Sequence, residues 1–362
     1  MIGKVNMHAS KPPRGGNKQI RSFGLMAITL GSALYTASLS ADTYLLPAGG
    51  DTVIGAVGLI EAIHEDTLPD LAYVYDQGFQ EMKLANPRVD TWIPREGTEV
   101  VVPSFYVLPD TPREGIVINV PEMRLYYFPK PKEGEAAVVV TYPISIGRQD
   151  WTTPLGLAKV TGKVKDPTWN PPESIRQEHA AQGDILPKVV LPGPDNPLGA
   201  YALYLNRKGY LIHGTDKPYG IGMRVTHGCI RLYPKDIERL FAEVEVGTPV
   251  NIVNQPFKAG WLNGVLYLET HPYLEEHGEA FADSFTQVVG QVTLATQDNQ
   301  VEVDWDRVQK VVSERTGIPA AISKSNPRNF SNTPADPDLL LVDEVLAEPA
   351  EPRQWVESIP GL

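Results

Sequence analysis

The stretch Leu211-Ile-His-Gly-Thr-Asp-Lys-Pro-Tyr-Gly-Ile-Gly-Met-Arg-Val-Thr-His-Gly-Cys-Ile-Arg-Leu232 contains the single cysteine of the 362-residue chain, Cys229. Two histidines, His213 and His227, precede the thiol, and a glycine follows each of them. A thiol is nucleophilic as thiolate, and a histidine within hydrogen-bond reach can accept its proton. Glycine permits close backbone approach, so amide N–H groups near Cys229 can face a developing oxyanion. The stretch therefore offers a nucleophile, a base and oxyanion donors together.

Cys229 has three other interpretations. A lone cysteine is often a small buried hydrophobe, but here two His-Gly pairs accompany it. Zinc binding by His213, His227 and Cys229 is disfavoured, because structural zinc sites have four ligands at tighter spacing; we expect no metal, and keep a zinc enzyme as a third possibility. In papain-like peptidases the cysteine comes first in the chain, whereas here both histidines precede it.

The pattern Ile-His-Gly-Thr at 212–215 followed by Thr-His-Gly-Cys-Ile-Arg at 226–231 resembles the signature of the L,D-transpeptidase (YkuD-type) catalytic domain. Blocks similar to the same family lie upstream, at 124–128, 142–147, 153–156 and 194–199. The resemblance covers residues 114–254 and implies a β-sandwich-like catalytic domain. The expected fold class is mainly β with α+β additions.

The resemblance also implies an activity. Such an enzyme cleaves a peptidoglycan stem tetrapeptide after its diamino acid, releases the terminal D-alanine and passes the acyl group to an amine, without a cofactor. Cys229 is then the nucleophile and His213 the base, and the backbone carbonyl of Gly214 orients the imidazole. The acceptor stays open between a diamino-acid amine, which gives a 3-3 cross-link, the terminal lysine of an outer-membrane lipoprotein, and water.

The remaining motif residues receive supporting roles. We expect His227, counted among the catalytic residues, to shape the turn together with Gly228 and Cys229 and to supply backbone donors. Thr226 and Gly228 are expected to contribute to substrate or oxyanion binding. Arg231 is expected to bind a carboxylate or to brace the loop. A protein that binds the wall through an inactive catalytic domain is the alternative from a different functional class.

Composition limits the other possibilities. The formal net charge of -12, from 44 acidic and 32 basic residues, argues against a nucleic-acid-binding surface and against an anionic-membrane patch. The 33 prolines and 31 glycines are typical of a turn-rich β architecture. One cysteine excludes an intramolecular disulfide.

Residues 1–41 have the order of a signal peptide. A basic run ends at Arg21, an apolar segment spans 23–34, and small residues surround Ser40 and Ala41, where we place the cleavage site. An uncleaved anchor is disfavoured because the segment is short and weakly hydrophobic. The sequence thus predicts export to the periplasm.

Residues 42–106 resemble a LysM module, a βααβ fold that binds glycan chains. A strand is expected at Thr43, a helix after Gly50 with Asp51 or Thr52 as its cap, and a closing strand before Pro103. A proline-containing linker follows at 107–113.

Within 114–254 we expect paired strands at 115–120 and 124–128, further strands at 202–205 and 210–213, and a helix with Pro234 as its first residue. The insertion 166–198 is long enough to be a functional loop over the site. A helical extension, 255–317, carries one apolar stripe at 281–292 and another capped by Asp304. His271 and His277 are expected at the surface, and the acidic, proline-rich tail 318–362 is expected to be disordered.

The oxidising environment of the periplasm should affect the Cys229 thiol. A cysteine without a partner in an oxidising periplasm is liable to oxidation, so we expect activity to depend on a thiol reductant. If His213 lowers the pKa of Cys229, the thiol should be unusually reactive toward alkylating reagents. By the family resemblance, carbapenems should acylate it.

Overall fold

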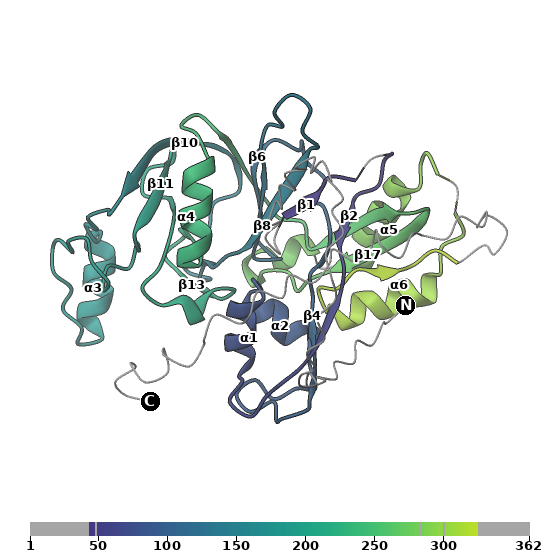
Figure 1. The fold of residues 1–362 in the computed structure, drawn as a ribbon, viewed down its shortest axis with the longest axis horizontal. Coiled ribbons are helices and arrows are strands. Elements are labelled where there is room, and N and C mark those ends of the chain that lie inside the picture. Colours follow the sequence, from purple (N-terminus) through teal and green to yellow (C-terminus); the bar gives the residue numbers. More distant parts are fainter. Residues whose placement is uncertain (1–42, 48, 282–283, 300, 325–362) are drawn as a thin grey trace, which may run out of the picture. The chain divides into compact units, whose positions relative to one another are not determined.

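The computed structural model describes residues 43–47, 49–281, 284–299 and 301–324 (Figure 1). The expected signal peptide and the tail beyond residue 324 lie outside the described residues. Among the described helices, none combines the length and the apolar character that a membrane crossing requires.

A curled nine-stranded sheet forms the centre of the described chain, in the order β1-β8-β7-β6-β15-β10-β11-β12-β14. Its strands are β1 (Thr43–Leu45), β6 (Gly115–Asn119), β7 (Arg124–Phe128), β8 (Val138–Pro143), β10 (Gly156–Lys165), β11 (Tyr201–Leu205), β12 (Leu211–His213), β14 (Ile230–Arg231) and β15 (Pro249–Val253). The predicted hairpin of β6 and β7 is confirmed, with Gly115 opposite Phe128 and Asn119 opposite Arg124. The ten-residue strand β10 was not predicted.

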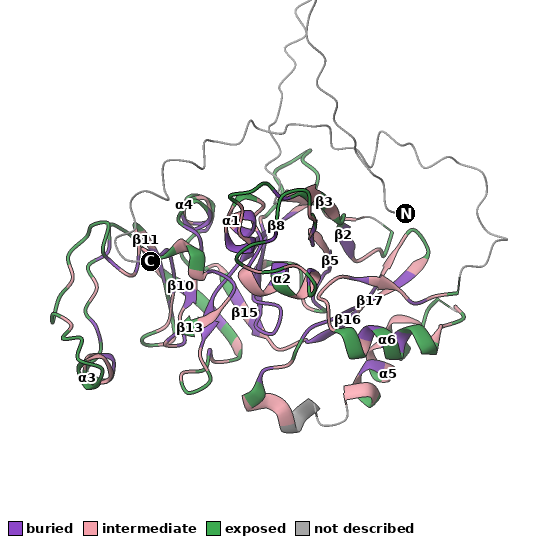
Figure 2. Ribbon diagram, turned by 90° about the horizontal axis from the view of Figure 1, so that it is seen from below, coloured by how far each residue is buried: buried purple, intermediate pink, exposed green. Residues whose placement is uncertain are grey.

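Strands β6, β7 and β8 are buried on both faces, which explains their nearly continuous apolar sequences. Ile116 and Ile118 point into one core, whereas Val117 between them points into a second core on the opposite face. Strand β10, in contrast, has both buried and exposed residues (Figure 2). Helix α4 (Pro234–Glu243) begins with Pro234 as predicted and contributes Ile237 and Leu240 to the first core.

The N-terminal region comprises two antiparallel strand pairs and two helices. Strand β2 (Val53–Gly55) pairs with β5 (Phe105–Val107), and β3 (Gly58–Glu61) pairs with β4 (Glu99–Val102). Helices α1 (Leu68–Val74) and α2 (Phe79–Ala85) lie between β3 and β4 in the chain, and pack around Leu68 and Met82. The order β3-α1-α2-β4 is the βααβ order of the predicted module.

Two expectations for this region are wrong. Thr43–Leu45 is a strand, but it pairs with β8 of the central sheet. The helix expected after Gly50 is strand β2, because the presumed caps bind elsewhere. Trp261 N donates to Thr52 Oγ1 (3.1 Å) and Asn263 N donates to Asp51 Oδ2 (3.0 Å). These bonds tie the segment to a hairpin about 210 residues further along the chain.

The C-terminal extension contains a sheet as well as the two expected helices. The sheet consists of strands β16 (Phe257–Leu262), β17 (Val265–Thr270) and β18 (Ala320–Ala321). A 3-10 helix, η2 (Glu275–Phe281), follows β17 in the chain. Helices α5 (Ser284–Ala295) and α6 (Trp305–Glu314) cover the sheet through valines that pack on Leu266 and Leu268. Because β18 is paired and Ile322 is fully buried, the disorder expected from residue 318 onward is wrong for residues 318–324, and the rest of that segment lies outside the described residues.

Buried charges join this extension to the central sheet. Lys258 Nζ lies 2.8 Å from both Glu122 Oε2 and Glu269 Oε1, and His271 Nε2 lies 2.6 Å from Glu269 Oε1. All four side chains are at most 5% exposed, so the surface position expected for His271 is wrong. The ligand atoms of Glu122, Glu269 and His271 are close enough together to bind a metal ion. Here the Lys258 ammonium is the cation that lies between the two carboxylates. Burial alone would lower the pKa of Lys258; the two carboxylates instead hold it above its usual value.

Candidate active site

Cys229 and His213 are brought together by two adjacent parallel strands. Strands β12 and β14 pair with Ile212 beside Ile230 and His213 beside Arg231. Cys229 directly precedes β14, and residues two apart in a strand point to the same face. The register thus places His213 opposite Arg231, two residues after Cys229, and the positive charge of Arg231 acts on both His213 and Cys229.

The His213 imidazole is buried, with 4% of the residue exposed. Its Nδ1 lies 2.7 Å from the carbonyl oxygen of Gly214. Since a carbonyl only accepts, Nδ1 carries the proton and the lone pair is on Nε2. Burial and then the positive charge of Arg231 lower the pKa of His213 to about 3, against the opposing effect of the Gly214 and Leu198 carbonyls. The ring is therefore a neutral base at pH 7, oriented by Gly214 as expected.

The Cys229 thiol is half-buried. Its Sγ donates to the carbonyl of Gly209 at 3.5 Å, and no hydrogen bond joins it to His213 within the described residues. Burial raises the pKa of Cys229, and this effect exceeds the lowering by a backbone bond to Leu211 and by the charge of Arg231. The expectation of a lowered pKa is thus contradicted. The resting pair is a thiol beside a neutral imidazole, not a thiolate-imidazolium pair.

Arg231 supplies positive charge to the site. Burial lowers its pKa, while Asp216 and Cys229 act in the opposite direction. Its Nε is buried and has no hydrogen-bond partner among the described residues. The backbone of Arg231 is fixed by a two-bond exchange with Ser145, at 2.8 and 3.0 Å. The backbone of Arg231 is therefore fixed, and the positive charge of its side chain acts on both Cys229 and His213.

The turn that precedes Cys229 is closed by Thr226. Its Oγ1 donates to the carbonyl of Cys229 (2.6 Å) and accepts from Gly228 N (3.2 Å). Gly228 has φ +95, and a Cβ there would lie 2.7 Å from Tyr210 Cε1, so only glycine fits. The Gly228 N–H expected to bind an oxyanion is occupied by Thr226 in this structure. Thr226 thus acts as a brace of the turn.

His227 points to the insertion and not to the thiol. Its Nε2 lies 3.0 Å from Glu178 Oε2, and its ring meets Trp151 edge to face at 5.0 Å. Glu178 lies on α3 (Glu173–Ala181), a helix inside the insertion that the sequence did not predict, and it also pairs with Arg148. That ion pair, followed by the bond to His227, lowers the pKa of Glu178. The long insertion indicated a functional loop, but no sequence signal pairs Glu178 with His227 49 residues away.

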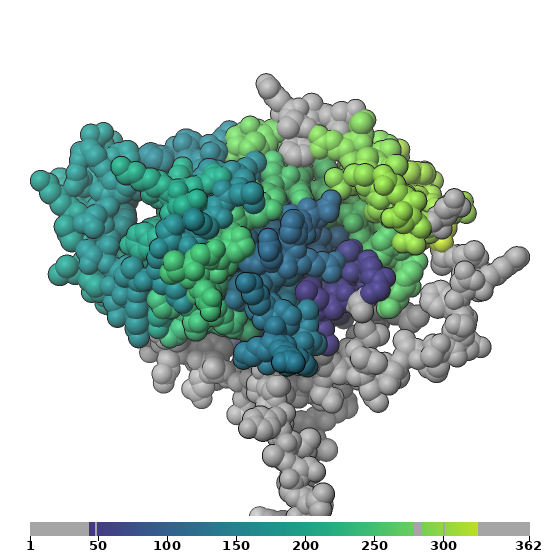
Figure 3. Space-filling model, turned by 90° about the horizontal axis from the view of Figure 1, so that it is seen from above, coloured from purple at the N-terminus to yellow at the C-terminus, as the bar shows by residue number. Residues whose placement is uncertain are grey.

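The insertion stands out from the rest of the catalytic region. In the space-filling view an opening remains beside this teal segment (Figure 3). Several apolar side chains on it are exposed, among them Ile185 and Leu191. The contacts of Glu178 with Arg148 and His227 are thus important for holding α3 near Cys229.

Comparison with known proteins gives a consistent result. A family model described as the L,D-transpeptidase catalytic domain (YkuD) matches residues 113–252. The chain is 40% identical to the protein named Probable L,D-transpeptidase YbiS of Escherichia coli (strain K12) over 294 residues, which are 80% of this chain and 94% of that one. It is 40% identical to Probable L,D-transpeptidase ErfK/SrfK of Salmonella typhimurium, over 79% of this chain and 93% of that one. Among solved structures, the catalytic domain of the Enterococcus faecium L,D-transpeptidase is 25% identical, with a TM-score of 0.30, over 40% of this chain and 100% of that chain.

Proposed function

The chain belongs to the L,D-transpeptidase family with the YkuD-type catalytic domain, and we propose that it transfers a peptidoglycan stem peptide through a thioester on Cys229. The observation that carries this proposal is the pairing of β12 with β14, which places His213 opposite Arg231 and thus close in the fold to Cys229, two residues before Arg231. The enzyme is a transpeptidase by its relatives. The thioester step and the residues that perform it are inferred from the site.

In the first half-reaction Cys229 Sγ attacks the carbonyl carbon of the diamino acid. The S–C bond forms as the proton leaves for His213 Nε2, and the C–N bond to D-alanine breaks as that proton passes to the departing amine. In the second half-reaction an acceptor amine attacks the thioester carbon, the new C–N bond forms and the S–C bond breaks, and a proton of the amine passes through His213 to the sulfur, which restores the thiol. Because His213 is neutral and Cys229 protonated at rest, proton transfer accompanies attack.

Arg231 and the turn around Cys229 stabilise the charged states. A tetrahedral intermediate places negative charge next to the thiol, within the field of the Arg231 guanidinium, whose Nε has no partner among the described residues. The Gly228 N–H can contribute if the oxyanion replaces Thr226 as its acceptor. Alternatively, Arg231 binds a carboxylate of the stem peptide.

D-Alanine release from a purified stem tetrapeptide tests the proposal. Cys229→Ser should lower the rate by several orders of magnitude, since a nucleophile and its base act as a unit, and His213→Gln should do the same. His179→Gln is the matched control, because this histidine is part of an exposed pair with Asp184 on the insertion. Activity of Cys229→Ser equal to that of the parent would refute the mechanism. Activity that survives a strong chelator excludes the zinc alternative.

The acceptor distinguishes the remaining alternatives. We propose an amine, from a diamino acid or from the terminal lysine of an outer-membrane lipoprotein; a hydrolase would pass the acyl group to water. Supplying each acceptor in turn and identifying the products by mass spectrometry separates the three. A mass increase of one carbapenem at Cys229 would be independent support for the nucleophile.

We further propose that the β3-α1-α2-β4 unit binds glycan and that the enzyme works in the periplasm, where a thiol reductant keeps Cys229 reduced. The βααβ order supports the first part. Co-sedimentation of the whole protein with peptidoglycan sacculi tests glycan affinity. Sedimentation without thiol-dependent turnover on any acceptor would favour the wall-binding alternative.

A further inference from the structure

The segment 214–223, which follows His213 and leads to the strand before Cys229, has little structure of its own. It contains three glycines and a single-turn helix, η1 (Pro218–Gly220), closed by a bond from Ile221 N to Pro218 O (3.0 Å). Ordering a glycine-rich backbone costs more conformational entropy than ordering other residues. Contacts from outside the segment must therefore fix its shape.

The first turn of helix α2 provides such contacts. Phe79 N donates to the carbonyl of Ile221 (3.0 Å), and Gln80 N donates to the carbonyl of Gly222 (3.3 Å). The first N–H groups of a helix have no partner within it, and here the segment from the active site satisfies two of them. Gly222 has φ +84, and a Cβ there would lie 2.2 Å from Phe79 N. The glycine thus allows the direct backbone contact.

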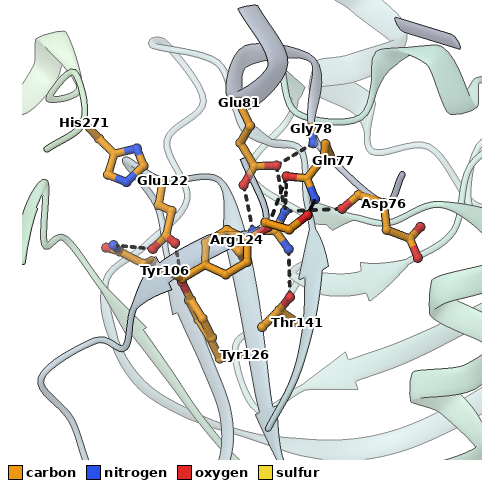
Figure 4. A network of polar contacts seen from close by, with 12 residues as sticks. Asp76, Gln77, Gly78, Glu81, Tyr106, Glu122, Arg124, Tyr126, Thr141 and His271 are labelled. Carbon is orange, nitrogen blue, oxygen red and sulfur yellow. Dashed lines mark hydrogen bonds and ion pairs between the residues drawn. The ribbon is translucent and has the colours of Figure 1, made fainter. Parts of the chain in front are cut away.

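Buried polar contacts hold the start of α2 in place (Figure 4). Glu81 accepts from Arg124 Nε (2.7 Å) and NH2 (2.8 Å), and also from Gly78 N (2.5 Å). Arg124 lies in β7 of the central sheet, is 1% exposed, and stacks over the Tyr106 ring at 4.4 Å. Beyond the segment, Tyr233 OH donates to Gln77 O (3.0 Å). The N-terminal unit is thus bound firmly to the catalytic sheet.

On the other side, residues 145 and 146, where strand β9 (Ile146–Gly147) begins, hold the same segment. Ser145 Oγ donates to Gly220 O (2.7 Å), and Ile146 N donates to Met223 O (3.3 Å). Strand β13 (Arg224–Thr226), which follows the segment, pairs with β9 (Ile146–Gly147). A displacement of segment 214–223 would therefore also displace Thr226 and, with it, the turn that precedes Cys229.

We propose that the first turn of α2 is a positioning element of the active site: the backbone N–H groups of Phe79 and Gln80 fix segment 214–223 and thereby the relative placement of His213 and Cys229. The N-terminal unit is then required for the chemical step, in addition to any binding of glycan. The expected change in kcat rests on the proposed function. The expected change in the labelling of Cys229 does not.

Proline substitution tests the proposal because it removes one N–H with little other change. Proline is tolerated in the first turn of a helix, and Gly78 before it is extended, with φ -83 and ψ 154, as a residue before proline should be. Phe79→Pro in the full chain is compared with Phe79→Ala, which loses the same ring and keeps the N–H. Gln80→Pro and Gln80→Ala form a second, independent pair.

Each variant is measured for D-alanine release, for thermal unfolding, and for the pH dependence of iodoacetamide labelling at Cys229. Relative to its alanine partner, each proline variant should lower kcat about 10- to 100-fold, the range expected for a misplacement near 1 Å. KM should change less than about twofold, whereas Tm should fall by about 2–6 °C, because the carbonyls of Ile221 and Gly222 belong to buried residues and each proline leaves one of them without its donor. The labelling midpoint should move in the proline variants alone.

Equal kcat and equal labelling profiles within both pairs would overturn the proposal. So would a loss of kcat that follows the loss of Tm in alanine and proline variants alike, which would indicate a purely structural role. If the parent releases no D-alanine, the proposed function fails, and the labelling profiles alone decide the inference. If one proline variant does not fold, the other pair decides.

Discussion

Acidification below pH 6.5 should destabilise the folded protein through His213, because burial keeps its imidazole uncharged in the folded chain. The imidazole has a pKa of about 3 in the folded chain and the ordinary value of 6.5 when unfolded. Between these values the unfolded chain binds one more proton at this residue than the folded chain does. The free energy of unfolding therefore falls as the pH falls from 6.5 toward 3.

The magnitude follows from the buried position of His213. Each pH unit below 6.5 multiplies the unfolding equilibrium constant by about ten on account of this group, which amounts to about 3 kcal/mol at pH 4.5. The assay is urea unfolding of the parent and of His213→Gln at pH 7.5, 6.5, 5.5 and 4.5. Glutamine does not titrate, so the difference between the two proteins isolates His213 from the carboxylates. The parent should lose about 3 kcal/mol more than the variant over this range.

Two results would refute this reasoning. A difference between parent and His213→Gln that stays constant with pH would show that residue 213 titrates equally in both states. An acid limb of kcat/KM near pH 6.5 in the parent would show a solvated imidazole, because a base with a pKa near 3 leaves activity flat there. Arg231→Gln should raise the pKa of His213 in the folded chain, because the Arg231 charge is, after burial, a cause of its lowering. The pH range over which His213 destabilises the fold should then become narrower.

Three further results are expected. Iodoacetamide labelling of native Cys229 should have its midpoint above the value of about 8.5 for a free thiol, because burial raises its pKa; a midpoint below 7 would contradict this. Glu178→Gln should leave the urea-unfolding midpoint of the protein nearly unchanged, because solvent screens the contacts of Glu178 with Arg148 and His227, yet limited proteolysis should cut the insertion faster than in the parent. Glu81→Ala should cost about 3–5 kcal/mol by leaving a buried cation unpaired, whereas the double variant Glu81→Gln with Arg124→Met should recover part of that loss in chemical denaturation; equal losses would argue against the pairing.

Several features follow from the sequence because neighbouring residues determine them. The hairpin of β6 and β7 follows from two apolar runs around a short turn. Helix α4 starts at Pro234 because proline fits a first helical turn, and α6 starts after Asp304, whose side chain accepts from Arg307 N. The residue types at 213, 227 and 229, with the glycines beside them, indicate a nucleophile, a base and oxyanion donors, and the resemblance to L,D-transpeptidases implies the role of Gly214. In each case the interaction spans a few residues or depends on residue type alone.

Other features depend on contacts between residues distant in the chain. The segment after Gly50 is a strand and not a helix because Thr52 bonds to Trp261. His227 binds the insertion because Glu178 is brought to it by the fold. Nothing in the local sequence encodes these partners.

The tertiary structure also decided the protonation state of the site. From sequence, a histidine near a cysteine indicates a lowered thiol pKa; in the structure, burial outweighs the charge of Arg231 and raises the pKa of Cys229. Desolvation and Coulomb effects depend on what packs around a group in three dimensions, and residue spacing does not contain that information. The sequence thus determined which groups take part, while the packing around Cys229 and His213 determined where their protons reside.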